Sequence, residues 1–186
     1  MKRLFDMVSS LVGLMIMSPV LLVFMFFVWI QDFRFPFYVT PCVDRYGKNF
    51  GMVKLRSMIA DADKSGVNST VAGDMHITGV GHLIRWYKLY EFTQLWNVLM
   101  GQMSLVGPRP ALYNQDDLIK LRTSKGIDKI IPGITGWAQV NGRDELPIPI
   151  KVEFDEYYLK NRSLFFDFKI LLKTFIKVLK SEGVSH

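Results

Sequence analysis

The sequence predicts a mostly α-helical chain with a small β-hairpin, held in a membrane by its N-terminal segment. Three observations predict this fold class. Residues 7–30 carry no charge, several later segments place apolar residues at helical spacing, and two short apolar runs flank a polar turn. The 186 residues are enough for one domain with its own core.

The uncharged run of residues 7–30 is long enough to cross a bilayer as one helix. It is too long for a cleaved signal peptide, and no small-x-small cleavage site follows it. Ser18 and Pro19 fall near its middle. Because proline removes a helical hydrogen bond, we expect a kink or break there, with the serine hydroxyl satisfying a backbone group that the proline frees.

Basic residues flank both ends of this run: Lys2 and Arg3 before it, and Arg34, Arg45 and Lys48 after it. A spanning helix normally has its basic residues mainly at one end. The pattern therefore suits a re-entrant helix whose two ends both lie on the cytoplasmic side. A plain kinked span fits these residues equally well.

The elements after the anchor are short. Residues 37–40 and 50–55 read as two strands around the polar turn of residues 44–49. Residues 61–74 have the composition of a mobile loop. Residues 83–100 have helical spacing, with large aromatic side chains, and are expected to form one helix.

The C-terminal half is expected to contain three more helices. Residues 115–125 and 151–161 form two of them, and the glycine-rich residues 131–142 are expected to form an ordered loop between them. Ser163 caps the last helix, in which apolar residues line one face and lysines another. Such a helix can lie on an anionic membrane or pack against its own domain with its lysines in water.

Composition limits the classes of function. The net charge of +6 is spread along the chain and suits an anionic membrane surface, phosphorylated substrates or nucleic acid. The sequence has no zinc-finger or RNA-binding signature, so nucleic acid is not expected as a partner. Cys42 is the only cysteine, which excludes an internal disulfide.

Three segments carry a specific pattern. They are Lys54-Leu55-Arg56-Ser57-Met58, Gln94-Leu95-Trp96-Asn97-Val98-Leu99 with its continuation to Val106-Gly107-Pro108-Arg109-Pro110, and Pro132-Gly133-Ile134-Thr135-Gly136-Trp137-Ala138-Gln139-Val140-Asn141-Gly142-Arg143. Together with the Ser-Pro-broken first helix and the Tyr157-Tyr158 pair, they resemble the monotopic phosphoglycosyl transferases, also called bacterial sugar transferases. The resemblance covers essentially the whole chain, with the segments in the right order and spacing.

The resemblance implies a fold and a location. Residues 1–32 would be a re-entrant membrane-anchoring helix, and residues 33–186 a catalytic-type domain with amphipathic helices in the membrane interface. The protein would lie on the cytoplasmic face of the bacterial inner membrane. Its oligomeric state, and whether it associates with partner glycosyltransferases, stay open.

The resemblance also implies a reaction and its participants. A sugar 1-phosphate would pass from a UDP-sugar to undecaprenyl phosphate with release of UMP and with Mg²⁺ as cofactor. This is an early membrane step of polysaccharide or glycoconjugate biosynthesis. In that family an aspartate attacks the sugar-linked phosphate, and the polyprenyl phosphate then takes the phosphosugar from the enzyme.

Phosphorylated substrates require fixed cations, and the forked donors of arginine match phosphate oxygens. The candidate phosphate-binding residues are Arg85, Arg109, Arg143, Lys54 and Arg56. A structural ion pair is the alternative for each of them. The glycines at 133, 136 and 142 could let the backbone approach a ligand closely or could make tight turns.

The sequence departs from the family pattern at the nucleophile. The family typically has Leu-Asp-Glu-Leu-Pro where this chain has Leu89-Tyr90-Glu91-Phe92-Thr93, so Tyr90 replaces the aspartate and Glu91 matches the glutamate. A tyrosine has a pKa near ~10 and attacks phosphorus only when a base or metal activates it. Glu91 is also the candidate metal ligand.

Four interpretations follow from this substitution. Tyr90 could be the nucleophile, activated by Glu91, Lys88 or Mg²⁺, or Glu91 could attack directly. The protein could instead be a non-catalytic pseudoenzyme that binds nucleotide sugar, polyprenyl phosphate or a partner transferase. A substitution made to trap substrate is the fourth.

Overall fold

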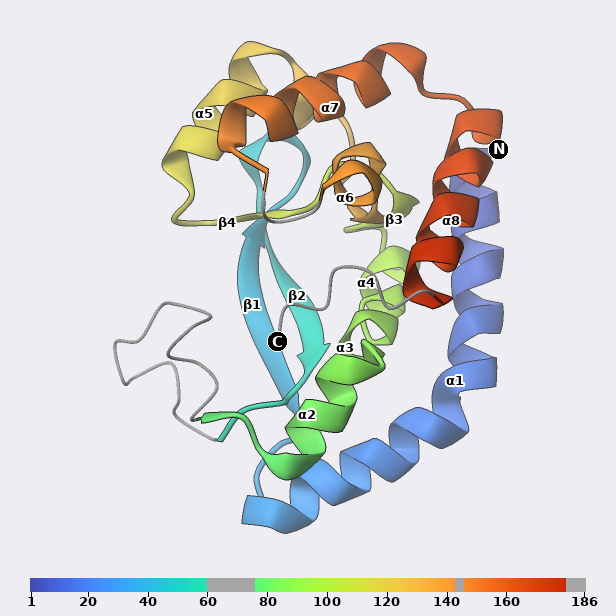
Figure 1. Cartoon of the computed structure of the whole chain (residues 1–186), viewed down its shortest axis with the longest axis vertical. Helices are drawn as coiled ribbons and strands as arrows, with labels where there is room; N and C mark the ends of the chain where they lie inside the picture. Colours follow the sequence, from blue (N-terminus) through green and yellow to red (C-terminus); the bar gives the residue numbers. More distant parts are fainter. Residues whose placement is uncertain (60–75, 143–145, 180–186) are drawn as a thin grey trace.

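The computed structural model describes residues 1–59, 76–142 and 146–179. The chain is mostly helical with two small sheets, as expected, although the sheets are more extensive than one hairpin. The proposed mobile loop of residues 61–74 and Arg143 lie outside the described residues. Figure 1 shows a long N-terminal helix along one side, with the sheets and the shorter helices beside it.

The first helix, α1 (Lys2–Asp32), is long and apolar enough to cross a membrane, and only 11% of its most apolar stretch is buried in the protein. It changes direction near its middle, the region that contains Pro19 (Figure 1). Proline has no N–H to donate to the carbonyl of Met15, four residues earlier. The Ser18 hydroxyl donates to that same carbonyl at 2.9 Å. The predicted role of the serine is therefore confirmed.

The hairpin is also confirmed, with longer strands than expected. Strands β1 (Phe37–Val43) and β2 (Asn49–Leu55) pair antiparallel, with the short helical turn η1 (Arg45–Gly47) between them. A third strand, β4 (Ala111–Leu112), pairs with β1 on its other edge.

The prediction of one helix over residues 83–100 is wrong. The segment contains the second half of α2 (Gly79–Trp86), then α3 (Leu89–Phe92) and α4 (Leu95–Leu99). The first break falls at Lys88, whose φ of 53° places it in the left-handed region and turns the chain. Helical spacing of apolar residues does not report such a single-residue turn.

The prediction of a loop over residues 131–142 is also wrong. This segment forms β5 (Gly133–Thr135) followed by α6 (Trp137–Asn141). Strand β5 pairs parallel with β3 (Ser104–Val106), which comes from the preceding specific segment. The two most specific stretches of the sequence are therefore hydrogen-bonded to each other.

The other predicted helices are confirmed within a few residues. They are α5 (Asp116–Ser124), α7 (Ile148–Asn161) and α8 (Leu164–Leu179), and the short η4 (Ile127–Lys129) follows α5. The backbone N–H of Phe166 donates to the Ser163 hydroxyl at 3.2 Å, as expected for a cap. The main core joins these elements around the buried side chains of Val106, Val152 and Ile170.

Helix α8 directs its apolar face outward. Phe165, Phe168, Leu172 and Phe175 are exposed, whereas Ile170 is fully buried. Figure 1 shows α8 beside the first half of α1, and the rings of Phe5 and Phe168 lie 5.1 Å apart. Water does not favour such a surface, which continues onto the exposed apolar residues of α1. The described residues therefore leave this face of α8 uncovered.

Candidate active site

A cavity of about 340 Å³ lies between α3, the β3–β5 sheet, α6 and α8. Tyr90, Glu91 and Arg109 line it together, although Arg109 follows Glu91 by eighteen positions in the sequence. Helix α8 supplies the facing wall through Leu171, Thr174, Phe175 and Val178. The cavity thus combines ionisable groups with an apolar wall that continues into the exposed face of α8.

The position of Tyr90 and Glu91 depends on the turn at Lys88. The N–H of Glu91 donates to the Lys88 carbonyl at 2.9 Å, which closes the first turn of α3. The Thr93 hydroxyl lies 2.8 Å from the Tyr90 carbonyl and 3.0 Å from the Val53 carbonyl of β2, which ties α3 to the sheet. The half-buried Tyr90 side chain also packs against the cluster formed by α1, α2 and β2.

Arg109 lies in the loop after β3, and close backbone contacts fix the start of this loop. The N–H of Gly107 donates to the Thr135 carbonyl, and the N–H of Gly133 donates to the Pro108 carbonyl, both at 2.8 Å. A Cβ on Gly133 would lie 2.1 Å from the Gly107 nitrogen, and one on Gly136 would lie 2.1 Å from the Gly107 oxygen. These two glycines therefore permit backbone-to-backbone packing, which was neither of the two roles predicted for them.

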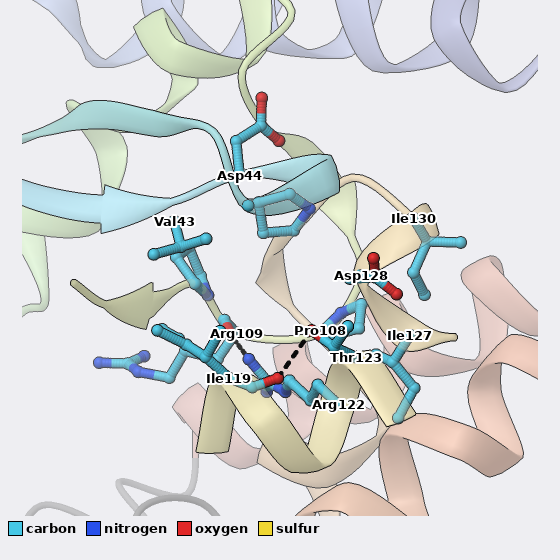
Figure 2. A pocket seen from close by; sticks show the side chains of 14 residues that line it. Val43, Asp44, Pro108, Arg109, Ile119, Arg122, Thr123, Ile127, Asp128 and Ile130 are labelled. Atoms are coloured by element: carbon cyan, nitrogen blue, oxygen red, sulfur yellow. Dashed lines mark hydrogen bonds between the residues drawn. The ribbon is translucent and has the colours of Figure 1, made fainter. Parts of the chain in front are cut away.

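A buried ion pair holds the other side of the Arg109 loop. The guanidinium of Arg122 (α5) donates to Asp155 Oδ2 (α7) through Nε at 3.0 Å and Nη2 at 2.6 Å. Its Nη1 donates to the Arg109 carbonyl at 2.7 Å, and both residues line a small cavity of about 50 Å³ (Figure 2). Burial raises the pKa of Asp155, although the adjacent guanidinium acts to lower it. The pair anchors the backbone of the residue whose side chain lines the larger cavity.

Gln139 of α6 has an unusual environment in the cavity wall. Its Oε1 and Nε2 are both buried, and neither has a hydrogen-bond partner among the residues that the structure describes. A buried polar group without a partner costs about 1–3 kcal/mol. Such an amide in a cavity wall is typical of a group that binds a ligand. Its residue type and its place in the Pro132–Arg143 segment gave no signal that distinguished it from its neighbours.

Three of the predicted phosphate-binding residues do not line the cavity. Arg56 forms an ion pair with Asp32 at 2.6 Å, and the Nε of Arg85 donates to the Ser57 hydroxyl at 3.1 Å. Lys54 lies on β2 opposite Tyr38. Arg56 and Arg85 therefore contact protein groups outside the cavity. Lys88, which was considered only as an activator of Tyr90, lines the cavity with Arg109.

The donor set for a metal ion is small. Glu91 is the one carboxylate among the described residues that line the cavity, and the described part of the chain contains no group of three or more His, Cys, Asp or Glu side chains that could hold a metal. Mg²⁺ commonly binds through one or two carboxylates, with substrate phosphates and water as the other ligands. Glu91 fits that mode of binding, in which the phosphates of the substrate complete the site.

Comparison with known proteins gives a consistent result over the whole chain. A family model described as bacterial sugar transferase matches residues 1–181. An uncharacterised sugar transferase of Bacillus subtilis, EpsL, is 38% identical and is matched over 100% of this chain and 91% of its own length. The exopolysaccharide production protein ExoY of Rhizobium meliloti is 32% identical, over 98% of this chain and 87% of that protein.

Other relatives are longer proteins. The undecaprenyl-phosphate galactose phosphotransferase of Salmonella typhimurium is 36% identical over 98% of this chain, which spans 41% of that protein. The match of the family model and the similarity of these relatives over nearly the whole chain lead to a single assignment. The chain belongs to the bacterial sugar transferase family.

Proposed function

We propose that this protein transfers a sugar 1-phosphate from a UDP-sugar to undecaprenyl phosphate and releases UMP. The relative in Salmonella typhimurium is named for the transfer of a galactose phosphate to undecaprenyl phosphate. The observation that supports this reaction best is the cavity that joins Tyr90, Glu91 and Arg109 to the apolar wall of α8. A polar end suits phosphates, and an apolar wall suits a polyprenyl chain.

The Gln139 carboxamide indicates which part of the nucleotide sugar it contacts. A carboxamide has two N–H donors and a carbonyl acceptor, so its partner must offer both an acceptor and a donor. Phosphate ester oxygens that carry no proton only accept. We therefore propose that Gln139 faces the uracil ring or a sugar hydroxyl, while Arg109 faces the diphosphate.

The proposed reaction has two steps. An oxygen of Tyr90 or Glu91 forms a bond to the phosphorus that carries the sugar, and the bond from that phosphorus to the UMP oxygen breaks. If Tyr90 attacks, its proton passes to the Glu91 carboxylate. The phosphate oxygen of undecaprenyl phosphate then attacks the same phosphorus, and the bond from phosphorus to the enzyme oxygen breaks. If Tyr90 was the nucleophile, Glu91 returns the proton to the Tyr90 oxygen as it leaves. Mg²⁺ held by Glu91 and substrate oxygens would neutralise charge on the diphosphate.

Trapping the phosphosugar–enzyme intermediate shows whether Tyr90 or Glu91 is the nucleophile. Purified protein is incubated with a radiolabelled UDP-sugar without acceptor, and the labelled protein is then treated with hydroxylamine. An acyl phosphate on Glu91 is cleaved by hydroxylamine, whereas an aryl phosphate on Tyr90 survives. Tyr90→Phe removes the label only if Tyr90 attacks, and Glu91→Ala removes a hydroxylamine-sensitive label.

The non-catalytic alternative predicts a different set of results. Wild-type protein would then release no UMP above a Tyr90→Phe, Glu91→Gln double variant when supplied with UDP-sugars, undecaprenyl phosphate and Mg²⁺. UMP release that appears only in the Tyr90→Asp variant would show that the wild-type protein lacks a working nucleophile. UMP release by the wild type at a rate above the double variant supports the proposed reaction.

We further propose that α1 is re-entrant and that the protein lies on the cytoplasmic face of the inner membrane. The bend at Pro19 and the exposed apolar face of α8 support a helix that enters and leaves on one side. Single cysteines at Leu4 and Phe35, in a Cys42→Ala background, report the two ends of α1. Both must be protected from an impermeant reagent in intact cells and must react after the cells are opened. External labelling of either cysteine contradicts the re-entrant arrangement.

A further inference from the structure

A second cavity, of about 430 Å³, lies away from the candidate active site, where α1 and α8 both begin. It shares no lining residue with the first cavity. Five cationic side chains and two carboxylates line it: Lys2, Arg3, Arg45, Lys129 and Arg162, with Asp6 and Asp167. We call this the N-terminal basic cavity. The cations exceed the carboxylates by three, which favours an anion.

Both carboxylates of this cavity, Asp6 and Asp167, accept hydrogen bonds from protein groups. Asp167 receives hydrogen bonds from Lys2 at 2.6 Å and from the Tyr158 hydroxyl at 2.7 Å. Asp6 is buried and accepts a hydrogen bond from the Ser104 hydroxyl at 2.8 Å. Because burial and the nearby Asp167 both disfavour a phenolate, the pKa of Tyr158 is raised well above its usual value. The hydroxyl therefore keeps its proton and continues to donate to Asp167.

Two of the cations are occupied as well. Lys2 pairs with Asp167, and the Arg3 guanidinium donates to the carbonyls of Val98 and Leu99 at the end of α4. The remaining three, Arg45, Lys129 and Arg162, are exposed. Neither Lys129 nor Arg162 forms an ion pair within the described part of the chain, so their charges are available to a ligand.

The surroundings of the cavity indicate the kind of anion. Leu4 and Phe165, in the first turns of α1 and α8, are 67% and 83% exposed, and Phe168 follows one turn later. Figure 1 shows that both helices begin at the same end of the molecule and run side by side. The cationic groups therefore lie where an extended apolar surface starts. A phospholipid has the matching arrangement, with an anionic phosphate directly above its acyl chains.

We propose that the N-terminal basic cavity binds the phosphate of an anionic phospholipid headgroup. Arg45, Lys129 and Arg162 contact the phosphate, and the acyl chains follow the exposed faces of α1 and α8. Such a contact fixes the depth and rotation of the domain at the membrane surface. The inference depends on membrane attachment and is independent of the transfer reaction.

The test uses the full chain in a neutral detergent, titrated with short-chain phosphatidylglycerol, short-chain phosphatidylcholine or inorganic phosphate. Binding is measured as the rise in melting temperature with ligand concentration. Phosphatidylglycerol is expected to stabilise the wild type at lower concentration than either other ligand. A Lys129→Gln, Arg162→Gln variant is expected to bind it about 30-fold more weakly, from roughly fivefold per cation at an anionic surface.

The matched control removes the same charge elsewhere. Lys48 and Lys120 are exposed and do not line this cavity, so a Lys48→Gln, Lys120→Gln variant should bind phosphatidylglycerol as the wild type does. Equal weakening in both variants would mean that only net charge matters and would overturn the site. Inorganic phosphate that binds as tightly as the lipid would overturn the lipid headgroup as ligand. UMP release in detergent should be the same in both variants, so failure of this inference is distinct from failure of the proposed reaction.

Discussion

The buried pair of Arg122 and Asp155 provides the sharpest test of how the structure holds Arg109. The two side chains are 7% and 1% exposed as whole residues, and the guanidinium contacts the carboxylate twice. Asp155→Asn leaves a buried guanidinium without its counter-charge, and arginine does not lose its proton in proteins. Removing one partner of a buried pair costs about 3–5 kcal/mol. For a chain of this length that loss lowers the melting temperature by about 6–20 °C.

Arg122→Met should behave differently because a carboxyl group can take up a proton. Without the guanidinium, burial outweighs the smaller lowering effect of Lys151 and keeps the folded-state pKa of Asp155 above the unfolded value. A group with a raised folded pKa disfavours folding as pH rises through that range. The deficit of Arg122→Met should therefore be smaller at pH 5 than at pH 8, whereas Asp155→Asn, which has no carboxyl group to protonate, should show no such recovery at pH 5.

The assay is thermal unfolding in detergent, followed by tryptophan fluorescence at both pH values. Glu156→Gln is the control, because Glu156 is the next residue of α7 and its pairs with Lys125 and Lys160 are open to solvent. Its loss in melting temperature should be far smaller than that of Asp155→Asn, because solvent screens both of its pairs. A double Arg122→Met, Asp155→Asn variant should recover part of the loss. Equal melting temperatures for Asp155→Asn and Glu156→Gln would refute the reasoning.

Three other predictions concern single positions. Asn97→Leu should lower stability by about 2–5 kcal/mol, measured by thermal unfolding, because the buried amide satisfies two backbone groups of β2. Pro19→Leu should restore the helical hydrogen bond and straighten α1, so that a cysteine at Phe35 becomes reactive from outside the cell; continued protection would show that Pro19 does not decide the topology. Hydrogen bonds from Lys125 and Lys160 lower the pKa of Glu156 to about 2. The stabilisation by this carboxylate is therefore complete at pH values above its unfolded-state pKa, and it is lost as the pH falls toward 2. Melting curves of the wild type and Glu156→Gln from pH 6 to pH 2 should converge.

Part of the candidate site could be predicted from the sequence alone. Tyr90 and Glu91 were identified by matching residues 89–93 to the family pattern, and Arg109 by its place in the specific segment that follows. The structure brings all three to one cavity. Arg56 and Arg85 were candidates because arginine suits phosphate, and neither lines this cavity. Residue type and motif position cannot distinguish these two outcomes, because the partners of an arginine come from elements that are distant in the sequence.

The sequence by itself determined the apolar anchor, the break at Pro19, the hairpin and the amphipathic last helix, because each depends on residues that are neighbours in the chain. Only the tertiary structure decided the left-handed turn at Lys88, the parallel pairing of β3 with β5 and the burial of the Gln139 amide without a partner among the described residues. These features depend on contacts across the fold. The cavities exist because helix α8 returns to α1 and the sheet, which is a long-range packing event that no local pattern encodes.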